Sequence, residues 1–131
     1  MSDAVRVLLI DDNPDDEELY PRGLQMEGFR VEDVDKDDRL ASVVESSDAD
    51  VVVFHLNGIF MWDACERVCK SARVPIVLLT AHVRPDRANR DRARRLGIAA
   101  FVAKPCTPED LGRVIKRVLA GERGLDVRSA R

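Results

Sequence analysis

The sequence predicts an α/β fold in which helices cover both faces of a five-stranded parallel sheet. The first observation is a series of five short apolar runs, at residues 5–10, 31–34, 51–56, 76–79 and 99–103. The second is that longer stretches with helical spacing separate them, and alternating strands and helices are typical of a parallel sheet. The third is the nearly continuous apolar character of the runs, which suits strands buried on both faces.

The first two helices are predicted from their end signals. Asn13 and Pro14 suit the cap and the first turn of a helix that follows the first run, and Gly28 suits its end. Pro21 lies inside this stretch, so we expect a kink or a late helix start there. A short helix over about 38–46 follows the second run.

The last three helices follow the third, fourth and fifth runs. The third helix is predicted over about 63–72 and the fourth over about 84–96, where Gly97 follows. In the fifth helix, Thr107 is a good N-cap and Gly121 a good C-terminal stop. Its apolar residues form one stripe for packing against the sheet: Leu111, Val114, Ile115, Val118 and Leu119.

Length and composition favour a single globular domain. A chain of 131 residues is in the range of one domain with its own core. Apolar residues make up 45% and charged residues 34%, which fits a packed interior and a strongly ionised surface. We expect this domain to span 1–121 and the segment 122–131 to be a frayed C-terminal tail, because no apolar period continues there.

Charge and hydropathy argue against several other classes of protein. The net charge of −3 gives no general attraction to nucleic acid or to an anionic membrane. No apolar run approaches the roughly 20 residues that cross a bilayer, and the N-terminal segment lacks the basic flank of a signal peptide. Three cysteines without disulfide spacing fit reduced thiols. We therefore expect a cytoplasmic protein without nucleic-acid or membrane partners.

Ionisable and polar residues gather where four of the five predicted strands end. Each alone has an ordinary structural explanation, such as a helix cap or a solvated charge. Together they predict a functional site, because the carboxyl ends of parallel strands converge on one crevice. The residues are Asp11, Asp12, His55, Asn57, Thr80 and Lys104.

Four segments of the sequence carry a resemblance to a known family. They read VLLIDDNPDD, DADVVVFHLN, VPIVLLTA and AAFVAKPCTPEDL. Together they resemble the receiver domains of two-component response regulators over nearly the whole chain, and the first is similar to small stand-alone receivers. The resemblance implies a flavodoxin-like, doubly wound sheet with strand order 2-1-3-4-5. It also implies a signalling module in a phosphorelay pathway and not an enzyme.

The resemblance also implies roles for the residues at the strand ends. In receivers an acidic pair, matched here by Asp11 and Asp12, holds Mg²⁺, and a backbone carbonyl, matched by Asn57, is a further ligand. A hydroxyl residue and a lysine bind the phosphoryl group, and Thr80 and Lys104 match them.

His55 departs from the family pattern, because it stands where receivers have the aspartate that accepts the phosphoryl group. This change removes the nucleophile. It also weakens the metal site, since Mg²⁺ prefers oxygen ligands and an imidazole suits Zn²⁺, Ni²⁺ or Cu²⁺. We therefore expect no cofactor, with Mg²⁺ binding weak or absent and the metal ligands vestigial.

Three functional interpretations follow from this substitution. The first is a pseudo-receiver that signals, scaffolds or dimerises without normal aspartyl phosphorylation. The second is a response regulator that still accepts phosphate, on His55 or on another group. The third is a metal-responsive site formed by Asp11, Asp12 and His55. Phosphorylation by a small donor distinguishes the first two.

Two further features concern partners. The segment GIFMW, residues 58–62, is unusually apolar for a loop, so Trp62 is a candidate anchor for a partner, unless Ile59 or Met61 packs under the third helix. The resemblance implies that Phe101 is the rotating switch aromatic. It also raises a homodimer through the fourth helix, fifth strand and fifth helix, and a sensor kinase or downstream target as partner.

Overall fold

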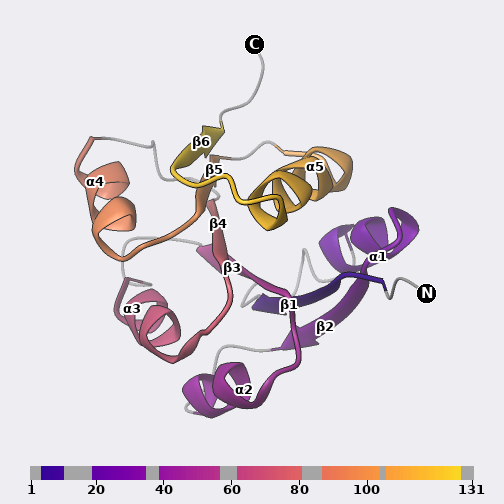
Figure 1. Cartoon of the computed structure of the whole chain (residues 1–131), viewed down its shortest axis with the longest axis horizontal. Coiled ribbons are helices and arrows are strands. Elements are labelled where there is room, and N and C mark those ends of the chain that lie inside the picture. Colours follow the sequence, from indigo (N-terminus) through magenta and orange to yellow (C-terminus); the bar gives the residue numbers. More distant parts are fainter. Residues whose placement is uncertain are drawn as a thin grey trace.

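The computed structural model describes residues 4–10, 19–34, 39–56, 62–80, 87–103 and 106–127, apart from the side chains of Leu56 and Asn89. Strands and helices alternate along these residues, as predicted (Figure 1). The elements are β1 (Arg6–Ile10), α1 (Leu19–Met26), β2 (Arg30–Val34), α2 (Leu40–Ser46), β3 (Val51–Leu56), α3 (Trp62–Ser71), β4 (Ile76–Thr80), α4 (Arg87–Arg95), β5 (Ala100–Ala103), α5 (Pro108–Leu119) and β6 (Leu125–Val127).

The sheet confirms the predicted fold class. Its strands are all parallel and lie in the order β2-β1-β3-β4-β5-β6, so the expected 2-1-3-4-5 order is present with one strand added. Helices α1 and α5 cover one face, and α2, α3 and α4 cover the other (Figure 1). Within the described residues, the helices lack the length and the apolar content that crossing a membrane requires.

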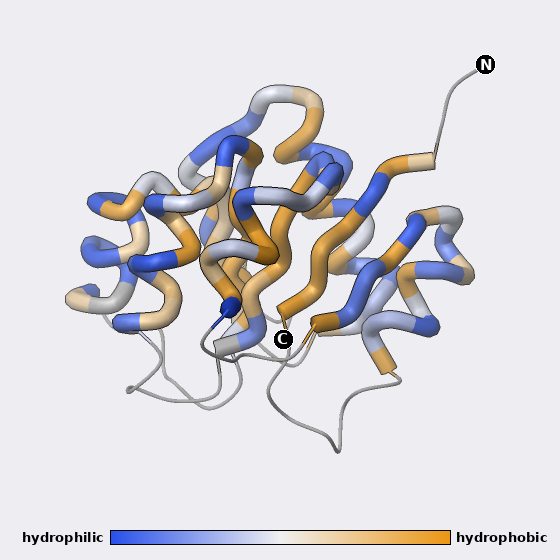
Figure 2. The backbone as a smooth tube through the Cα atoms, turned by 90° about the horizontal axis from the view of Figure 1, so that it is seen from below, coloured by the Kyte–Doolittle hydropathy of each residue, from blue (hydrophilic) through white to orange (hydrophobic). Residues whose placement is uncertain are grey.

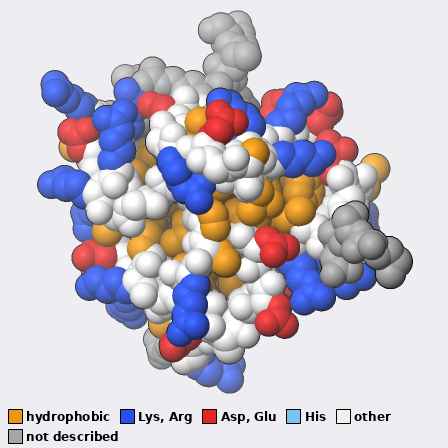
Figure 3. Space-filling view, viewed as in Figure 1, with side chains coloured by type: hydrophobic (Ala, Val, Ile, Leu, Met, Phe, Trp, Pro, Cys, Tyr) orange, Lys and Arg blue, Asp and Glu red, His pale blue; other side chains and the backbone are white. Residues whose placement is uncertain are grey.

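Side-chain alternation along the strands divides the core into two layers. In β1, Val7 and Leu9 belong to the layer under α1 and α5, whereas Leu8 and Ile10 belong to the layer under α2, α3 and α4. Apolar strands therefore run between helices that carry most of the hydrophilic residues (Figure 2). Apolar side chains gather at the centre of the face shown in Figure 3, and charges of both signs surround them.

Helix α1 is described from Leu19 to Met26 and contains Pro21. The residues before Leu19 lie outside the described part of the chain, so the expected kink or late helix start at this proline stays a prediction. The same helix approaches α5 very closely, because a Cβ atom at Gly23 would collide with the side chain of Pro108. Glycine at this position lets the two helices share one face of the sheet.

Helix α5 begins as the sequence predicts. The backbone N–H of Asp110 donates a 3.0 Å hydrogen bond to Oγ1 of Thr107, and Pro108 occupies the first turn. Four of the five predicted stripe residues are buried. Leu119 is the exception, because it lies at the end of the helix and its side chain is exposed.

Strand β6 corrects the expectation of a frayed tail. Leu125–Val127 forms a sixth parallel strand against β5, and Figure 1 shows it beside β5, between α4 and α5. Leu125 and Val127 pack against the α1–α5 core layer, so the segment has the period of a strand. Three residues are too few for that period to be recognised in a sequence. Residues 128–131 lie outside the described part of the chain.

Candidate functional site

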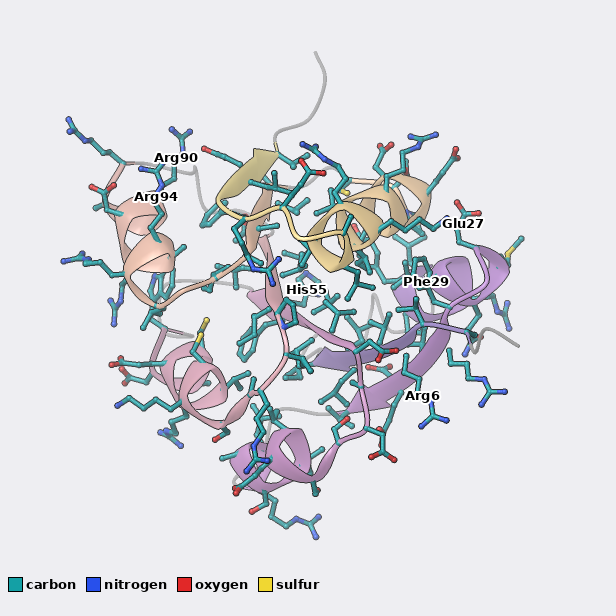
Figure 4. All side chains as sticks on the ribbon, in the orientation of Figure 1. Arg6, Glu27, Phe29, His55, Arg90 and Arg94 are labelled. Atoms are coloured by element: carbon teal, nitrogen blue, oxygen red, sulfur yellow. The ribbon has the colours of Figure 1, made fainter. Side chains whose placement is uncertain are left out.

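His55 lies near the carboxyl end of β3, one of the two central strands of the sheet. The alternation that puts Val51 and Val53 in the α1–α5 layer puts His55 on the same side. Its side chain is only 1% exposed, and Figure 4 shows it near the middle of the molecule. The imidazole is therefore part of the core and not an exposed group at the rim.

Tyr20 of α1 packs against this imidazole. The two rings meet edge to face, with centroids 6.1 Å apart and planes inclined at 73°. The Tyr20 hydroxyl donates a 2.7 Å hydrogen bond to the backbone carbonyl of Cys106, in the connection between β5 and α5. Tyr20 thus joins the histidine of β3 to the loop that leads into α5. Sequence reasoning missed Tyr20, because a tyrosine inside a helical period gives no signal of its long-range partners.

Thr80 ends the neighbouring strand β4 and is also buried. It pairs in register with Leu56 on one side and Ala103 on the other. Its hydroxyl donates a long hydrogen bond of 3.5 Å to the carbonyl of Val102. The structure thus brings His55 and Thr80 to the same edge of the sheet, on adjacent strands. Alternation along each strand places their side chains on opposite faces.

The other predicted site residues lie outside the described residues. They are Asp11, Asp12, Asn57 and Lys104, which follow β1, β3 and β5 in the sequence. Their assembly into one crevice with His55 and Thr80 therefore stays a prediction. Among the residues that the structure does describe, no three His, Cys, Asp or Glu side chains form a group that could hold a metal ion.

Comparison with known proteins identifies the family of this chain. A family model described as the response regulator receiver domain matches residues 7–116. The chain belongs to this family. The receiver is 29% identical over 119 residues to a probable transcriptional regulator, ycf27, of Guillardia theta. That alignment covers 87% of the receiver but 45% of the relative, so the chain spans less than half of that protein's length.

Solved structures show the same fold. A CheY-like receiver domain protein of Methanospirillum hungatei is 22% identical, with a TM-score of 0.76 over 89% of this receiver and 94% of that chain. A response regulator of Burkholderia pseudomallei was solved with a phosphorylated aspartic acid, calcium ion and citrate. It is 19% identical, with a TM-score of 0.73 over 88% of this receiver and 69% of that chain. At these identities the similarity establishes the fold of the receiver and no more.

Phe101, the residue that matches the switch aromatic, points into the receiver. Its side chain is buried in the layer under α2, α3 and α4. In the sheet register it lies opposite Asp126 of the added strand β6. The ring therefore faces the core, with β6 on the neighbouring edge of the sheet. A role of Phe101 as a switch stays a prediction.

Trp62 is not the exposed anchor that the sequence suggested. It is the first residue of α3, its side chain is 6% exposed, and it belongs to the layer under α2, α3 and α4. The guanidinium carbon of Arg92 lies 5.0 Å from the centroid of its ring, in a cation–π contact. This burial contradicts the expectation of an exposed anchor at Trp62. Ile59 and Met61 lie outside the described residues.

Two cysteines of α3 lie one turn apart, with Cys65 fully buried and Cys69 half-buried. A side-chain hydrogen bond links them. It raises the pKa of Cys65, an effect that burial strengthens, and it lowers the pKa of Cys69. Cys69 is therefore the more readily ionised thiol of the pair.

Proposed function

We propose that this receiver acts as a pseudo-receiver, a signalling module that works through protein contacts without normal aspartyl phosphorylation. The observation that carries the proposal is the buried imidazole of His55 at the carboxyl end of β3. By the family resemblance this is the position of the phosphoacceptor aspartate. An aspartate there attacks phosphorus with a carboxylate oxygen, and the histidine has none to offer.

The neighbours of His55 support the same conclusion. Its ring lies against the ring of Tyr20, which is itself buried and tied by its hydroxyl to the carbonyl of Cys106. A group that accepts a phosphoryl from a donor in solution has to reach that donor. A side chain that is 1% exposed and in edge contact with a tyrosine is poorly placed for this reaction.

The Mg²⁺ that receivers use does not fit the described part of this site. Mg²⁺ requires close to ideal octahedral coordination and strongly prefers oxygen. His55 offers an imidazole nitrogen where the family has a carboxylate oxygen. We therefore assign no step to the metal. The function proposed is that of a binding module in the cytoplasm, with a sensor kinase or a downstream signalling protein as its partner.

Incubation with a small phosphodonor and Mg²⁺, followed by intact mass measurement, tests this proposal. We expect the unmodified chain to keep its mass. His55→Asp restores a carboxylate, and we expect partial and slow gain of one phosphoryl group, because Gly58 and Ile59 replace the Met-Pro that follows the site in receivers. Adding Thr80→Ala to His55→Asp should reduce that gain, since Thr80 matches the phosphoryl-binding hydroxyl.

The result that overturns the proposal is a phosphoryl group on the unmodified chain. Peptide mapping would then identify the acceptor. A group on His55 would favour a receiver that still accepts phosphate, and a group on another residue would show that the acceptor has moved. Either outcome would replace the pseudo-receiver by an active phosphorelay component.

A further inference from the structure

Cys65 and Cys69 form a pair of thiols on one face of α3. They are four positions apart, so they lie on the same side of the helix, one turn from each other. Cys65 is fully buried in the layer under α2, α3 and α4, and Cys69 is half-buried and packs against the same layer. The hydrogen bond between the two side chains brings their sulfur atoms into direct contact. The two sulfurs are therefore positioned to act together.

The helical spacing of this pair does not suit a disulfide bond. Side chains four positions apart on a helix have Cβ atoms about 5–6 Å from each other, whereas a disulfide requires about 3.5–4.5 Å. A direct bond between the two sulfurs would therefore distort α3. An ion that binds both sulfurs imposes no such strain, because two metal–sulfur bonds of about 2.3 Å hold the sulfurs roughly 4 Å apart. The spacing thus favours a bridging ion.

The number and type of ligands restrict which ion the pair can bind. Among the residues that the structure describes, no third His, Cys, Asp or Glu side chain joins the two thiols to form a metal-binding group. Zn²⁺ takes four ligands in a structural site, so it is a poor match for two. Thiolates select soft ions such as Cu(I), which two thiolates alone can coordinate. The pair therefore fits a soft ion of low coordination number.

The charges beside the pair favour a monovalent ion. Oε2 of Glu66 lies 3.9 Å from Nη2 of Arg92 on α4, and Oε1 lies 3.9 Å from Nζ of Lys70. Two cations and one carboxylate leave one net positive charge next to the thiols. Cu(I) with two thiolates carries one negative charge, so the two charges balance. The hydrogen bond from Cys69 and burial raise the pKa of Cys65, and the charge of Arg92 lowers it.

We propose that Cys65 and Cys69 form a binding site for a soft monovalent cation, Cu(I), with one metal–sulfur bond to each residue. Binding releases the two thiol protons to solvent and transfers no electrons. The half-buried Cys69 meets the ion first, and Cys65 completes the chelate. The bound ion clamps the turn of α3 that lies beside Arg92, and this site does not depend on whether His55 accepts a phosphoryl group.

Anaerobic titration of the reduced full chain with Cu(I), in competition with a coloured Cu(I) chelator, tests the proposal. We expect one ion per chain. Cys69→Ala should lower the affinity roughly a hundredfold or more, because the second ligand of a chelate acts at a high effective concentration. Cys106→Ala is the matched control, since it removes the remaining cysteine of the chain and leaves the pair intact. It should bind as the unmodified chain does.

Two further measurements test the charge balance and the location of the ion. Arg92→Gln keeps both thiols but removes the balancing cation, so Cu(I) binding should weaken several-fold. Zn²⁺ at the same concentration should not displace Cu(I) from the unmodified chain. Amide hydrogen exchange within α3 should become slower when Cu(I) is added, because the ion joins two successive turns of this helix. Cys69→Ala should show no such change.

Three results would overturn the proposal. The first is a Cys69→Ala variant that binds Cu(I) as tightly as the unmodified chain. The second is loss of binding in Cys106→Ala. The third is a disulfide between Cys65 and Cys69 that forms under mild oxidation and leaves the amide exchange of α3 unchanged, because the pair would then be a redox site. Circular dichroism of each ion-free variant establishes that lost binding does not come from unfolding.

Discussion

Tyr20 and His55 meet edge to face in the core, with ring centroids 6.1 Å apart, although 34 residues lie between them in the chain. The tyrosine comes from α1 and the histidine from β3, and the tyrosine hydroxyl reaches the carbonyl of Cys106. This contact makes His55 part of the packing between the sheet, α1 and the β5–α5 connection. If His55 stands at the acceptor position, as we propose, that position is a packed part of the core.

Tyr20→Phe isolates the hydroxyl of this contact. The ring remains, but the Cys106 carbonyl loses its 2.7 Å donor, so we expect the free energy of unfolding to fall by about 1 kcal/mol. Urea unfolding followed by circular dichroism measures the change. Tyr20→Leu, which also removes the ring, should cost more. Equal stability of Tyr20→Phe and the unmodified chain would mean that the hydrogen bond contributes nothing net.

Trp62→Ala tests whether the indole belongs to the core. Its side chain is 6% exposed, and truncating a buried aromatic residue typically costs about 3–5 kcal/mol. The control is Arg92→Gln, which removes the cation over the ring and should cost only about 0.5–1 kcal/mol. Chemical denaturation of both variants gives the comparison. Near-normal stability of Trp62→Ala would contradict a stabilising role of the indole in this core layer.

Gly23→Ala tests the close approach of α1 and α5. Alanine would normally stabilise a helix relative to glycine by about 0.5–1 kcal/mol, but here its Cβ would collide with Pro108. We expect a net loss of about 1–2 kcal/mol, because overpacking forces the two helices apart.

The matched control for that variant is Gly112→Ala, on α5. Its Cβ would lie 3.1 Å from Cε2 of Phe29, a contact that a small shift of the ring relieves. In thermal unfolding, the midpoint temperature of Gly23→Ala should be clearly lower than that of Gly112→Ala. The reverse order would show that the two helices separate without cost.

The cysteine pair of α3 predicts a pH-dependent reactivity. The hydrogen bond from Cys65 lowers the pKa of Cys69, so the reactive thiolate of Cys69 forms at lower pH than that of an ordinary thiol. The same bond, and after it burial, raises the pKa of Cys65. Iodoacetamide should therefore modify Cys69 well before Cys65, as measured by peptide mass mapping over a pH series.

Cys65→Ala removes the donor of that bond. The pH at which iodoacetamide begins to modify Cys69 should then be higher than in the unmodified chain. The modification of Cys106 over the same pH series serves as the internal reference. An unchanged Cys69 profile would contradict a role for the hydrogen bond in setting its pKa.

Several features of this receiver could be predicted because their signals are local. The apolar runs of β1 and β3 specify buried strands wherever they occur, and Thr107 with Pro108 starts α5 through contacts within one turn. The fold class and the strand order of the first five strands followed from these signals and from the family resemblance. So did the position of His55 and Thr80 at the same edge of the sheet.

Other features depend on residues that are distant in the sequence. The apolar segment before α3 indicates burial or binding equally well, and only the tertiary packing of the layer under α2, α3 and α4 makes Trp62 part of the core. The segment of β6 is too short to specify a strand by itself, and it becomes one because β5 supplies hydrogen bonds and Arg90 supplies the partner of Asp126. Such contacts form only when the chain closes long loops, so their energies are not contained in any local stretch of sequence.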